Sequence, residues 1–205
     1  MTGRSDRTKW NRAAPHYEGL ASRAAERRWA EFKRSLFADM EGRVLFLAAG
    51  TGLDFQFFPP RREIVAIDVS ERMLQRAASR ACRYDGSIEL QQMDVLRLGF
   101  RDGCFDQIYT SCTFCSVSRP REGLRQLRRV LRPGGTLSMF EHTASRWFPF
   151  SVMLHACTPL MRAFGPEMNR RTVRNVREAG FEIRSVERHY LDVVKSIRAR
   201  KPVPS

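Results

Sequence analysis

The feature that most constrains this chain is an apolar run that breaks into a glycine-rich turn. Residues 44–48 are apolar and strand-like, Gly50 and Gly52 follow closely, and Asp68 ends the next apolar run. Small residues at a strand end let the backbone approach a ligand that a Cβ would block. A carboxylate at the tip of the adjacent strand can accept both hydroxyls of a ribose. The spacing therefore predicts a site for a nucleoside cofactor.

Strand-like and helical patterns alternate along the chain after a helical stretch at residues 15–40. The strand-like runs are 43–48, 63–68, 87–92, 105–111 and 136–141, and helical patterns at 71–83 and 120–131 lie between some of them. This alternation predicts an α/β fold with a doubly wound, parallel sheet. Ligands of such sheets bind beyond the carboxyl ends of the strands, where Asp94 and Ser111 fall together with the glycine turn. The sequence Pro133-Gly134-Gly135 is expected to stop the second helix and lead into the fifth strand.

Composition favours a cytoplasmic protein of one domain. A chain of 205 residues with 42% hydrophobic content can bury a full-sized core. No apolar run is long enough to cross a membrane, and the first residues lack the apolar stretch of a signal peptide. The five cysteines are an odd number, so reduced thiols are expected in place of a disulfide framework.

The positive charge is unevenly distributed. The net charge of +14 comes from residues 1–43, which carry +4, and residues 119–205, which carry +11, whereas residues 44–118 carry −1. Basic flanks around a neutral centre favour an anionic partner, either a nucleic acid or the surface of an acidic membrane.

Five ordered motifs lie between residues 43 and 142. They are Ala48-Ala49-Gly50-Thr51-Gly52, Ile67-Asp68-Val69-Ser70 with Met73, Met93-Asp94, Phe105-Asp106-Gln107-Ile108 and Leu131-Arg132-Pro133-Gly134-Gly135. Together they resemble class I S-adenosylmethionine-dependent methyltransferases. The resemblance implies a Rossmann-like, mostly parallel, seven-stranded sheet with an N-terminal helical extension, and S-adenosylmethionine as the cofactor.

The resemblance also implies the cofactor contacts. Gly50 and Gly52 would contact the methionine part, Asp68 the ribose hydroxyls, and Asp94 the adenine amino group, with methionines on either side of the adenine. The expected cofactor-binding residues are Ala48, Gly50, Thr51, Gly52, Asp68, Val69, Met73, Met93, Asp94, Val95 and Ser111.

Two positions depart from the family pattern. Phe46 stands where the family usually has an acidic residue, and Ala48 replaces the first glycine of the turn. The missing carboxylate removes the usual contact at the amino-acid end of the cofactor, and Asp54 is a nearby candidate to replace it. Ala48 is tolerable if its backbone φ is negative.

Downstream residues resemble small bacterial phospholipid N-methyltransferases, of the type first described in Rhodobacter, and animal thiol methyltransferases. They are Thr113-Phe114-Cys115-Ser116-Val117, Glu141-His142, Gly165-Pro166-Glu167-Met168-Asn169-Arg170 and Ala179-Gly180-Phe181, and quinone methyltransferases share them in part. The resemblance implies stepwise N-methylation of phosphatidylethanolamine toward phosphatidylcholine. The alternatives are a quinone precursor, a small thiol or an RNA base as acceptor, or a non-catalytic cofactor- or membrane-binding module.

An apolar insertion at residues 145–168 lies between the predicted fifth strand and the helix that follows. It is expected within a methyltransferase domain of residues 43–205, which follows an amphipathic helical cap at residues 1–42. The insertion either joins the core as a lid or forms a lipid-facing anchor, because its Trp and Phe residues stand beside arginines. The anchor interpretation predicts a protein bound peripherally to an anionic membrane at its cytoplasmic face. The protein is expected to be a monomer. Nucleic acid is disfavoured because the insertion has no use there.

Methyl transfer to a lipid amine requires loss of a proton before attack. The candidate catalytic residues are Tyr17, Glu141 and His142. Aromatic side chains can stabilise a methylammonium, and basic or amide side chains can bind a lipid phosphate. The candidate substrate-binding residues are Phe114, Trp147, Asn169, Arg170 and Lys195. No metal is expected, because Cys112 and Cys115 have no second pair at zinc spacing.

Overall fold

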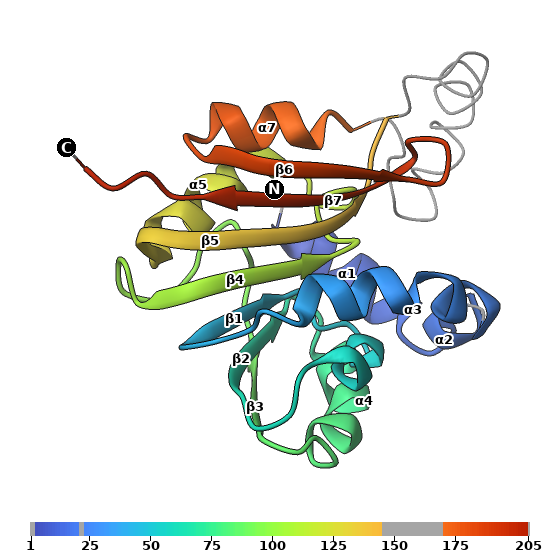
Figure 1. The fold of residues 1–205 in the computed structure, drawn as a ribbon. Coiled ribbons are helices and arrows are strands. Elements are labelled where there is room, and N and C mark those ends of the chain that lie inside the picture. Colours follow the sequence, from blue (N-terminus) through green and yellow to red (C-terminus); the bar gives the residue numbers. More distant parts are fainter. Residues whose placement is uncertain (1–2, 21–22, 145–169, 205) are drawn as a thin grey trace.

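The computed structural model describes residues 3–20, 23–144 and 170–204. A seven-stranded sheet forms its centre, in the order β3-β2-β1-β4-β5-β7-β6 (Figure 1). The strands are β1 (Val44–Leu47), β2 (Glu63–Asp68), β3 (Ser87–Gln92), β4 (Phe105–Ser111), β5 (Leu131–His142), β6 (Glu182–His189) and β7 (Val194–Arg200). Strands β1 to β5 pair in parallel, and β7 pairs antiparallel with both β5 and β6. The predicted Rossmann-like, mostly parallel sheet is confirmed.

Helices cover both faces of the sheet. They are α1 (Gly3–Ala13), α2 (Tyr17–Leu20), α3 (Arg23–Phe37), the 3-10 helix η1 (Leu53–Phe57), α4 (Glu71–Ala81), α5 (Pro120–Val130) and α7 (Thr172–Glu178). Alternate residues of β1 divide the core. Val44 and Phe46 pack with α3, η1 and α4, whereas Leu45 and Leu47 pack with α5 and α7. The doubly wound arrangement therefore leaves the carboxyl ends of the parallel strands at one edge.

Phe46 stands where the family pattern has a carboxylate, and it belongs to the hydrophobic core. Its ring packs against Phe58 with centroids 4.9 Å apart and against Phe37 at 5.9 Å, and the side chain is fully buried. A buried carboxylate without a partner would be costly among these rings, so the whole cluster favours an aromatic residue here.

Two element boundaries differ from the sequence prediction. The segment Pro133-Gly134-Gly135 lies inside β5, because Leu131 already pairs with Phe105 and a register shift follows. Gly134 has a φ of +75° and donates its N–H to Lys201 O at 2.9 Å, which keeps this bulge in the sheet. The polar start of the chain, within the predicted helical cap but outside the helical stretch at residues 15–40, forms α1.

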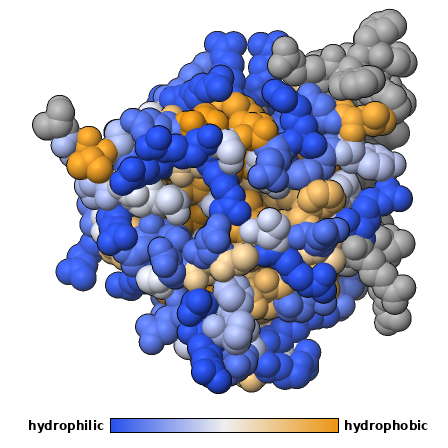
Figure 2. Space-filling view, in the orientation of Figure 1, coloured by the Kyte–Doolittle hydropathy of each residue, from blue (hydrophilic) through white to orange (hydrophobic). Residues whose placement is uncertain are grey.

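The surface is mostly hydrophilic in the view of Figure 2. Across the described ranges, no helix is long and apolar enough to cross a membrane. The predicted apolar insertion at 145–168, with Trp147, and also Asn169, lie outside the described residues.

Candidate cofactor and substrate site

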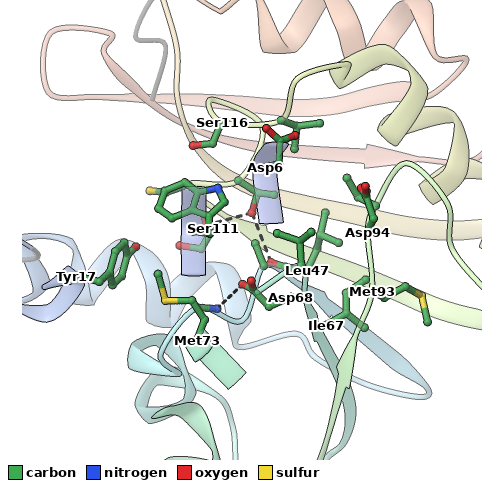
Figure 3. Close-up of a pocket in the computed structure, with 18 residues that line it drawn as sticks. Asp6, Tyr17, Leu47, Ile67, Asp68, Met73, Met93, Asp94, Ser111 and Ser116 are labelled. Carbon is green, nitrogen blue, oxygen red and sulfur yellow. Dashed lines mark hydrogen bonds between the residues drawn. The ribbon is translucent and has the colours of Figure 1, made fainter. Parts of the chain in front are cut away.

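A cavity lies at the carboxyl ends of β1, β2 and β4, between these strand ends and the N-terminal helices (Figure 3). Its walls are Asp6, Trp10, Tyr17, Leu47, Ala48, Gly50, Ile67, Asp68, Val69, Met73, Met93, Asp94, Val95, Ser111, Cys112, Thr113, Ser116 and Val117. The cavity thus brings together every predicted cofactor residue except Thr51 and Gly52, which do not line it.

The glycine-rich turn follows β1 with an unusual backbone. Ala48 has a φ of +56°, so the negative φ that would have made an alanine easy to accept is not found. A left-handed alanine costs about 1–2 kcal/mol. The turn is held by Ala49 N–H donating to Ile67 O at 2.9 Å and Gly52 N–H donating to Ala49 O at 2.9 Å. The first bond ties the turn to β2, the second closes the turn on itself, and both offset the strain.

The two glycines have different roles. Gly50 has a φ of +55°, and a Cβ there would meet only Ala48 O, at 4.0 Å, so a side chain would occupy open space at the cavity wall. A Cβ on Gly52 would instead lie 2.9 Å from the ring of Phe55. Gly50 therefore leaves room for a ligand against the backbone, which fits S-adenosylmethionine, whereas Gly52 serves packing.

Asp68 ends β2 and organises the turn. Its carboxylate accepts the N–H of Gly50 at 2.9 Å and the N–H of Ser70 at 2.8 Å. Burial raises the pKa of Asp68, although these backbone donors act in the opposite direction. Each carboxylate oxygen keeps a further lone pair, so Asp68 can fix the glycine turn and still accept from ribose hydroxyls.

The side chains expected to surround the adenine of the cofactor, Met73, Met93 and Asp94, line the cavity beside the ends of β2 and β3. Asp94 accepts the N–H of Leu96 at 2.9 Å, which fixes one carboxylate oxygen. Met73 follows the N-cap Ser70 of α4, and Figure 3 shows Met73 and Met93 to either side of Asp68. Two flexible thioethers and Asp94 suit an apolar ring that carries an amino group.

The N-terminal helices, where the sequence predicts a helical cap, form one wall of the cavity, and Asp6 and Trp10 are the lining residues that the sequence did not single out. Asp6 and Trp10 from α1 and Tyr17 from α2 line the cavity, and the two aromatic rings meet edge-on with centroids 6.2 Å apart. The sequence signal that could have indicated this wall is Trp10, a single large aromatic residue in an otherwise polar, basic segment.

Polar contacts fasten these helices to α4. Asn11 accepts the hydroxyl of Ser70 at 2.7 Å, directly beside the turn that follows Asp68. Arg80 donates to Glu18 at 2.9 and 3.2 Å and to Thr51 O at 2.8 Å. Arg80 therefore connects α2 with the glycine turn. Thr51 does not line the cavity, and its backbone carbonyl takes part in this connection by accepting from Arg80.

The segment after β4 forms the wall opposite α4, and Glu141 holds it in place. Glu141 is fully buried and accepts the hydroxyl of Thr110 at 2.8 Å and the N–H groups of Thr113 and Phe114 at 3.1 and 3.0 Å. Cys112 has a φ of +51° and donates its N–H to Phe140 O at 2.7 Å. These bonds turn Cys112 and its neighbours toward the cavity.

Of the predicted catalytic residues, only Tyr17 lines the cavity. Glu141 has its carboxylate occupied by three donors, and burial raises its pKa to about 7. His142 lies outside the cavity wall, and burial, with Lys33 nearby, lowers its pKa. Glu141 therefore supports the cavity wall through these hydrogen bonds, and neither Glu141 nor His142 lines the cavity.

The predicted substrate residues within the described ranges also lie elsewhere. Phe114 is 1% exposed and belongs to the core, and Lys195 forms a buried ion pair with Asp192 at 2.8 Å. Arg170 donates to Val117 O at 3.1 Å, and Val117 itself lines the cavity. Lys195 and Phe114 are thus structural residues, whereas Arg170 supports the cavity wall.

Asp54 does not replace the carboxylate missing at Phe46. Its side chain pairs with Lys33 at 2.6 Å, and neither residue lines the cavity. Asp6 is the carboxylate at the cavity wall that the sequence did not reveal.

Burial raises the pKa of the Cys115 thiol to about 12 and that of the Cys112 thiol well above its usual value. Within the described ranges, no group of three acidic, His or Cys side chains could hold a metal.

Comparison with known proteins defines the class. Residues 45–139 match the family model described as "Methyltransferase domain". Fold, cavity and this match together show that the chain carries a class I S-adenosylmethionine-dependent methyltransferase domain, and S-adenosylmethionine is its cofactor.

Individual relatives divide between several acceptors. The human thiol S-methyltransferase TMT1B is 31% identical over 152 residues, which are 68% of this chain and 62% of that protein. The phosphatidylethanolamine N-methyltransferase of Cereibacter sphaeroides is 30% identical over 126 residues, 60% of this chain and 62% of that protein. A solved S-adenosylmethionine-dependent methyltransferase from Thermotoga maritima superposes with a TM-score of 0.71 at 18% identity, covering 96% of this chain and 99% of that one. The chain spans half to about three fifths of the length of the first curated relatives.

Proposed function

We propose that this protein transfers methyl groups from S-adenosylmethionine to the amine of phosphatidylethanolamine, and of its mono- and dimethyl forms, toward phosphatidylcholine. The observation that carries the proposal is the aromatic pair of Trp10 and Tyr17 at the cofactor cavity. A methylated ammonium is a weakly hydrated cation, and aromatic rings stabilise such a cation by about 0.5–2 kcal/mol. A methyl thioether or a methylated quinol is uncharged and gains nothing from the pair. The pair therefore favours an amine acceptor.

Asp6 and Tyr17 are the residues to which we assign the proton. When bound, S-adenosylmethionine supplies an electrophilic methyl group on its sulfonium. A head-group amine is largely protonated at neutral pH and must lose that proton before it attacks. The Asp6 carboxylate attracts the ammonium, and the Tyr17 hydroxyl accepts the proton from nitrogen while it releases its own to water. Both side chains line the cavity, as this assignment requires.

We further propose that the protein works as a monomer, bound peripherally to an anionic membrane at its cytoplasmic face. The net charge of +14 supports this, because each Arg or Lys near an anionic surface contributes about 1 kcal/mol. The sequence of the apolar insertion at 145–168, with Trp and Phe beside arginines, supports it too. The similarity to the Cereibacter enzyme is consistent with a phospholipid acceptor.

Lipid extraction after reaction tests the proposal. The protein is incubated with radiolabelled S-adenosylmethionine and phosphatidylglycerol vesicles, with or without phosphatidylethanolamine. We expect label in the lipid phase only when phosphatidylethanolamine is present. Trp10→Leu should slow this transfer about tenfold, while Trp10→Phe, which keeps an aromatic face, should retain most of it. Label that stays in the aqueous phase with every vesicle would contradict the proposal.

The second candidate is S-methylation of a small thiol, which the similarity to human TMT1B favours. A thiol acceptor needs no aromatic support for its product, so Trp10→Leu should leave its methylation nearly unchanged. Adding 2-mercaptoethanol to the same assay decides between the two. Labelled thioether without labelled lipid would select the second candidate.

A further inference from the structure

Exposed hydrophobic side chains gather where β6 turns into β7 beside α3. Tyr190 is 59% exposed, Leu191 is 42% exposed, and Phe32 of α3 is 36% exposed. Trp29, half-buried, completes the group, which we call the aromatic patch. Val203, near the C-terminus, is the other exposed large hydrophobic residue of the described ranges. Figure 2 shows hydrophobic atoms on the surface both near the C-terminus and on the opposite side, where β6 meets β7.

Ring contacts hold the aromatic patch in place. The ring of Trp29 meets that of Tyr190 edge-on with centroids 5.9 Å apart and that of Phe140 at 5.7 Å. Phe32 lies against His189 at 4.1 Å. The guanidinium of Arg28 lies 5.0 Å from the centre of the Tyr190 ring. The patch is thus a packed arrangement that combines aromatic rings with an exposed positive charge.

The turn that carries the patch has a strained backbone. Tyr190, Leu191 and Asp192 have φ values of +47°, +54° and +64° in succession, and none of them is glycine. Each such residue costs about 1–2 kcal/mol. The ion pair of Asp192 with Lys195, at 2.8 Å, and the bond from Val193 N–H to Tyr190 O, at 3.1 Å, hold the turn in this form. The protein therefore maintains a costly turn that exposes two large hydrophobic side chains.

The aromatic patch lies at the same edge of the sheet as the cofactor cavity. Val194 at the start of β7 pairs with His142 at the carboxyl end of β5. Phe140 touches Trp29 with its ring and accepts the N–H of Cys112, which lines the cavity. In Figure 1 the turn between β6 and β7 and the helices α1 to α3 lie at this edge. A surface bound at the patch would therefore lie near the cavity.

We propose that the aromatic patch docks the protein on an anionic phospholipid bilayer. This inference rests on the proposed function, since it names the surface that would bring the cavity to its lipid. Tyr and Trp rings favour the interface between lipid tails and water, and Leu191 would insert among the acyl chains. Arg28 would meet the anionic head groups, in keeping with a net charge of +14. The charge and the amphipathic rings together fit a bilayer better than a second basic copy of this chain.

Vesicle flotation of the full chain tests the aromatic patch. The vesicles contain phosphatidylglycerol and phosphatidylethanolamine, and the variant combines Tyr190→Asn with Leu191→Asn. Asparagine tolerates a positive φ, so the turn is not strained further. We expect the double variant to partition into vesicles about thirtyfold less than the native protein. Val203→Asn, which removes a similarly exposed side chain at the other edge, should change partitioning less than about twofold.

Several results would overturn the inference. The first is that the native protein does not float with the vesicles, and the second is that the double variant floats as well as the native protein. The third is that the native protein forms a dimer that dissociates on dilution and that the double substitution abolishes. Binding of S-adenosylmethionine by the double variant, measured by calorimetry, should equal that of the native protein and shows that it is folded. Vesicle binding through the patch without lipid methylation would contradict only the proposed function. Lipid methylation with patch-independent binding would contradict only the inference.

Discussion

Replacing Asp68 by asparagine separates cofactor binding from folding. The carboxylate accepts two backbone N–H groups, from Gly50 and Ser70, and only one amide oxygen would remain to accept. The amide NH2 would face the second N–H group, which costs about 1–3 kcal/mol. Burial already raises the pKa of Asp68, so removal of the charge offsets part of this loss. We therefore expect unfolding free energy to fall by less than about 2 kcal/mol.

Cofactor affinity should respond more strongly than stability. The ribose hydroxyls would lose bonds to a charged acceptor, each worth about 1.5–3 kcal/mol, so Asp68→Asn should weaken the affinity for S-adenosylmethionine about a hundredfold. Asp94→Asn, which disturbs one backbone bond, from Leu96, is the matched control and should weaken it about tenfold. Titration calorimetry gives the affinity, and urea unfolding gives the stability. Binding by Asp68→Asn within about threefold of the native protein would refute the assigned ribose contact.

Four further substitutions test neighbouring parts of the site. Gly50→Ala should abolish most cofactor binding with a modest loss of stability, because φ is +55° and the Cβ enters the cavity wall. Gly52→Ala should mainly lower the melting temperature, because its Cβ would clash with the Phe55 ring. Calorimetry measures the first effect and thermal unfolding the second. Burial raises the pKa of Glu141 to about 7, above its usual 4.5, so its stability contribution is present below pH 4.5 and is lost as the pH rises through 7. Urea unfolding at pH 5.5 and 8 should show this loss in the native protein but not in Glu141→Gln. Tyr17→Phe should leave cofactor affinity unchanged and slow lipid methylation at least about tenfold at pH 7. The rate of the variant should recover in part at pH 9.5, where more of the amine is free. Equal rates of lipid methylation by the variant at both pH values would contradict the role of Tyr17.

Local patterns were sufficient for the central sheet and the cofactor edge. The strands at 63–68, 87–92 and 105–111 have the predicted bounds. The first and third are buried parallel strands, whose apolar runs have distinct ends, whereas the strand at 87–92 lies at the edge of the sheet and is half exposed. The glycine turn and Asp68 were identifiable because their chemistry requires small residues and a carboxylate at a fixed spacing. These features depend on residues near one another in sequence.

Contacts between distant residues explain what the sequence did not reveal. Asp6 and Trp10 lie at the cavity in helices that bind α4 through distant partners, Asn11 with Ser70 and Glu18 with Arg80, each about sixty residues apart in sequence. Glu141 looked catalytic because it ends a strand on the ligand side, yet its carboxylate turns to Thr113 and Phe114. Periodicity defines which face of an element is apolar, and it does not specify which polar side chain meets which partner.

In the proposed reaction, the cofactor's methyl group arrives on a phospholipid amine. Mass spectrometry of intact lipids tests it most directly, after the protein has been incubated with deuteriomethyl S-adenosylmethionine and vesicles that contain phosphatidylethanolamine. We predict head-group fragments that carry one, two and three deuteriomethyl groups on nitrogen, and about a hundredfold less of them when Asp68→Asn replaces the native protein at limiting cofactor. Unchanged phosphatidylethanolamine, together with deuterium on an added thiol, would contradict the account.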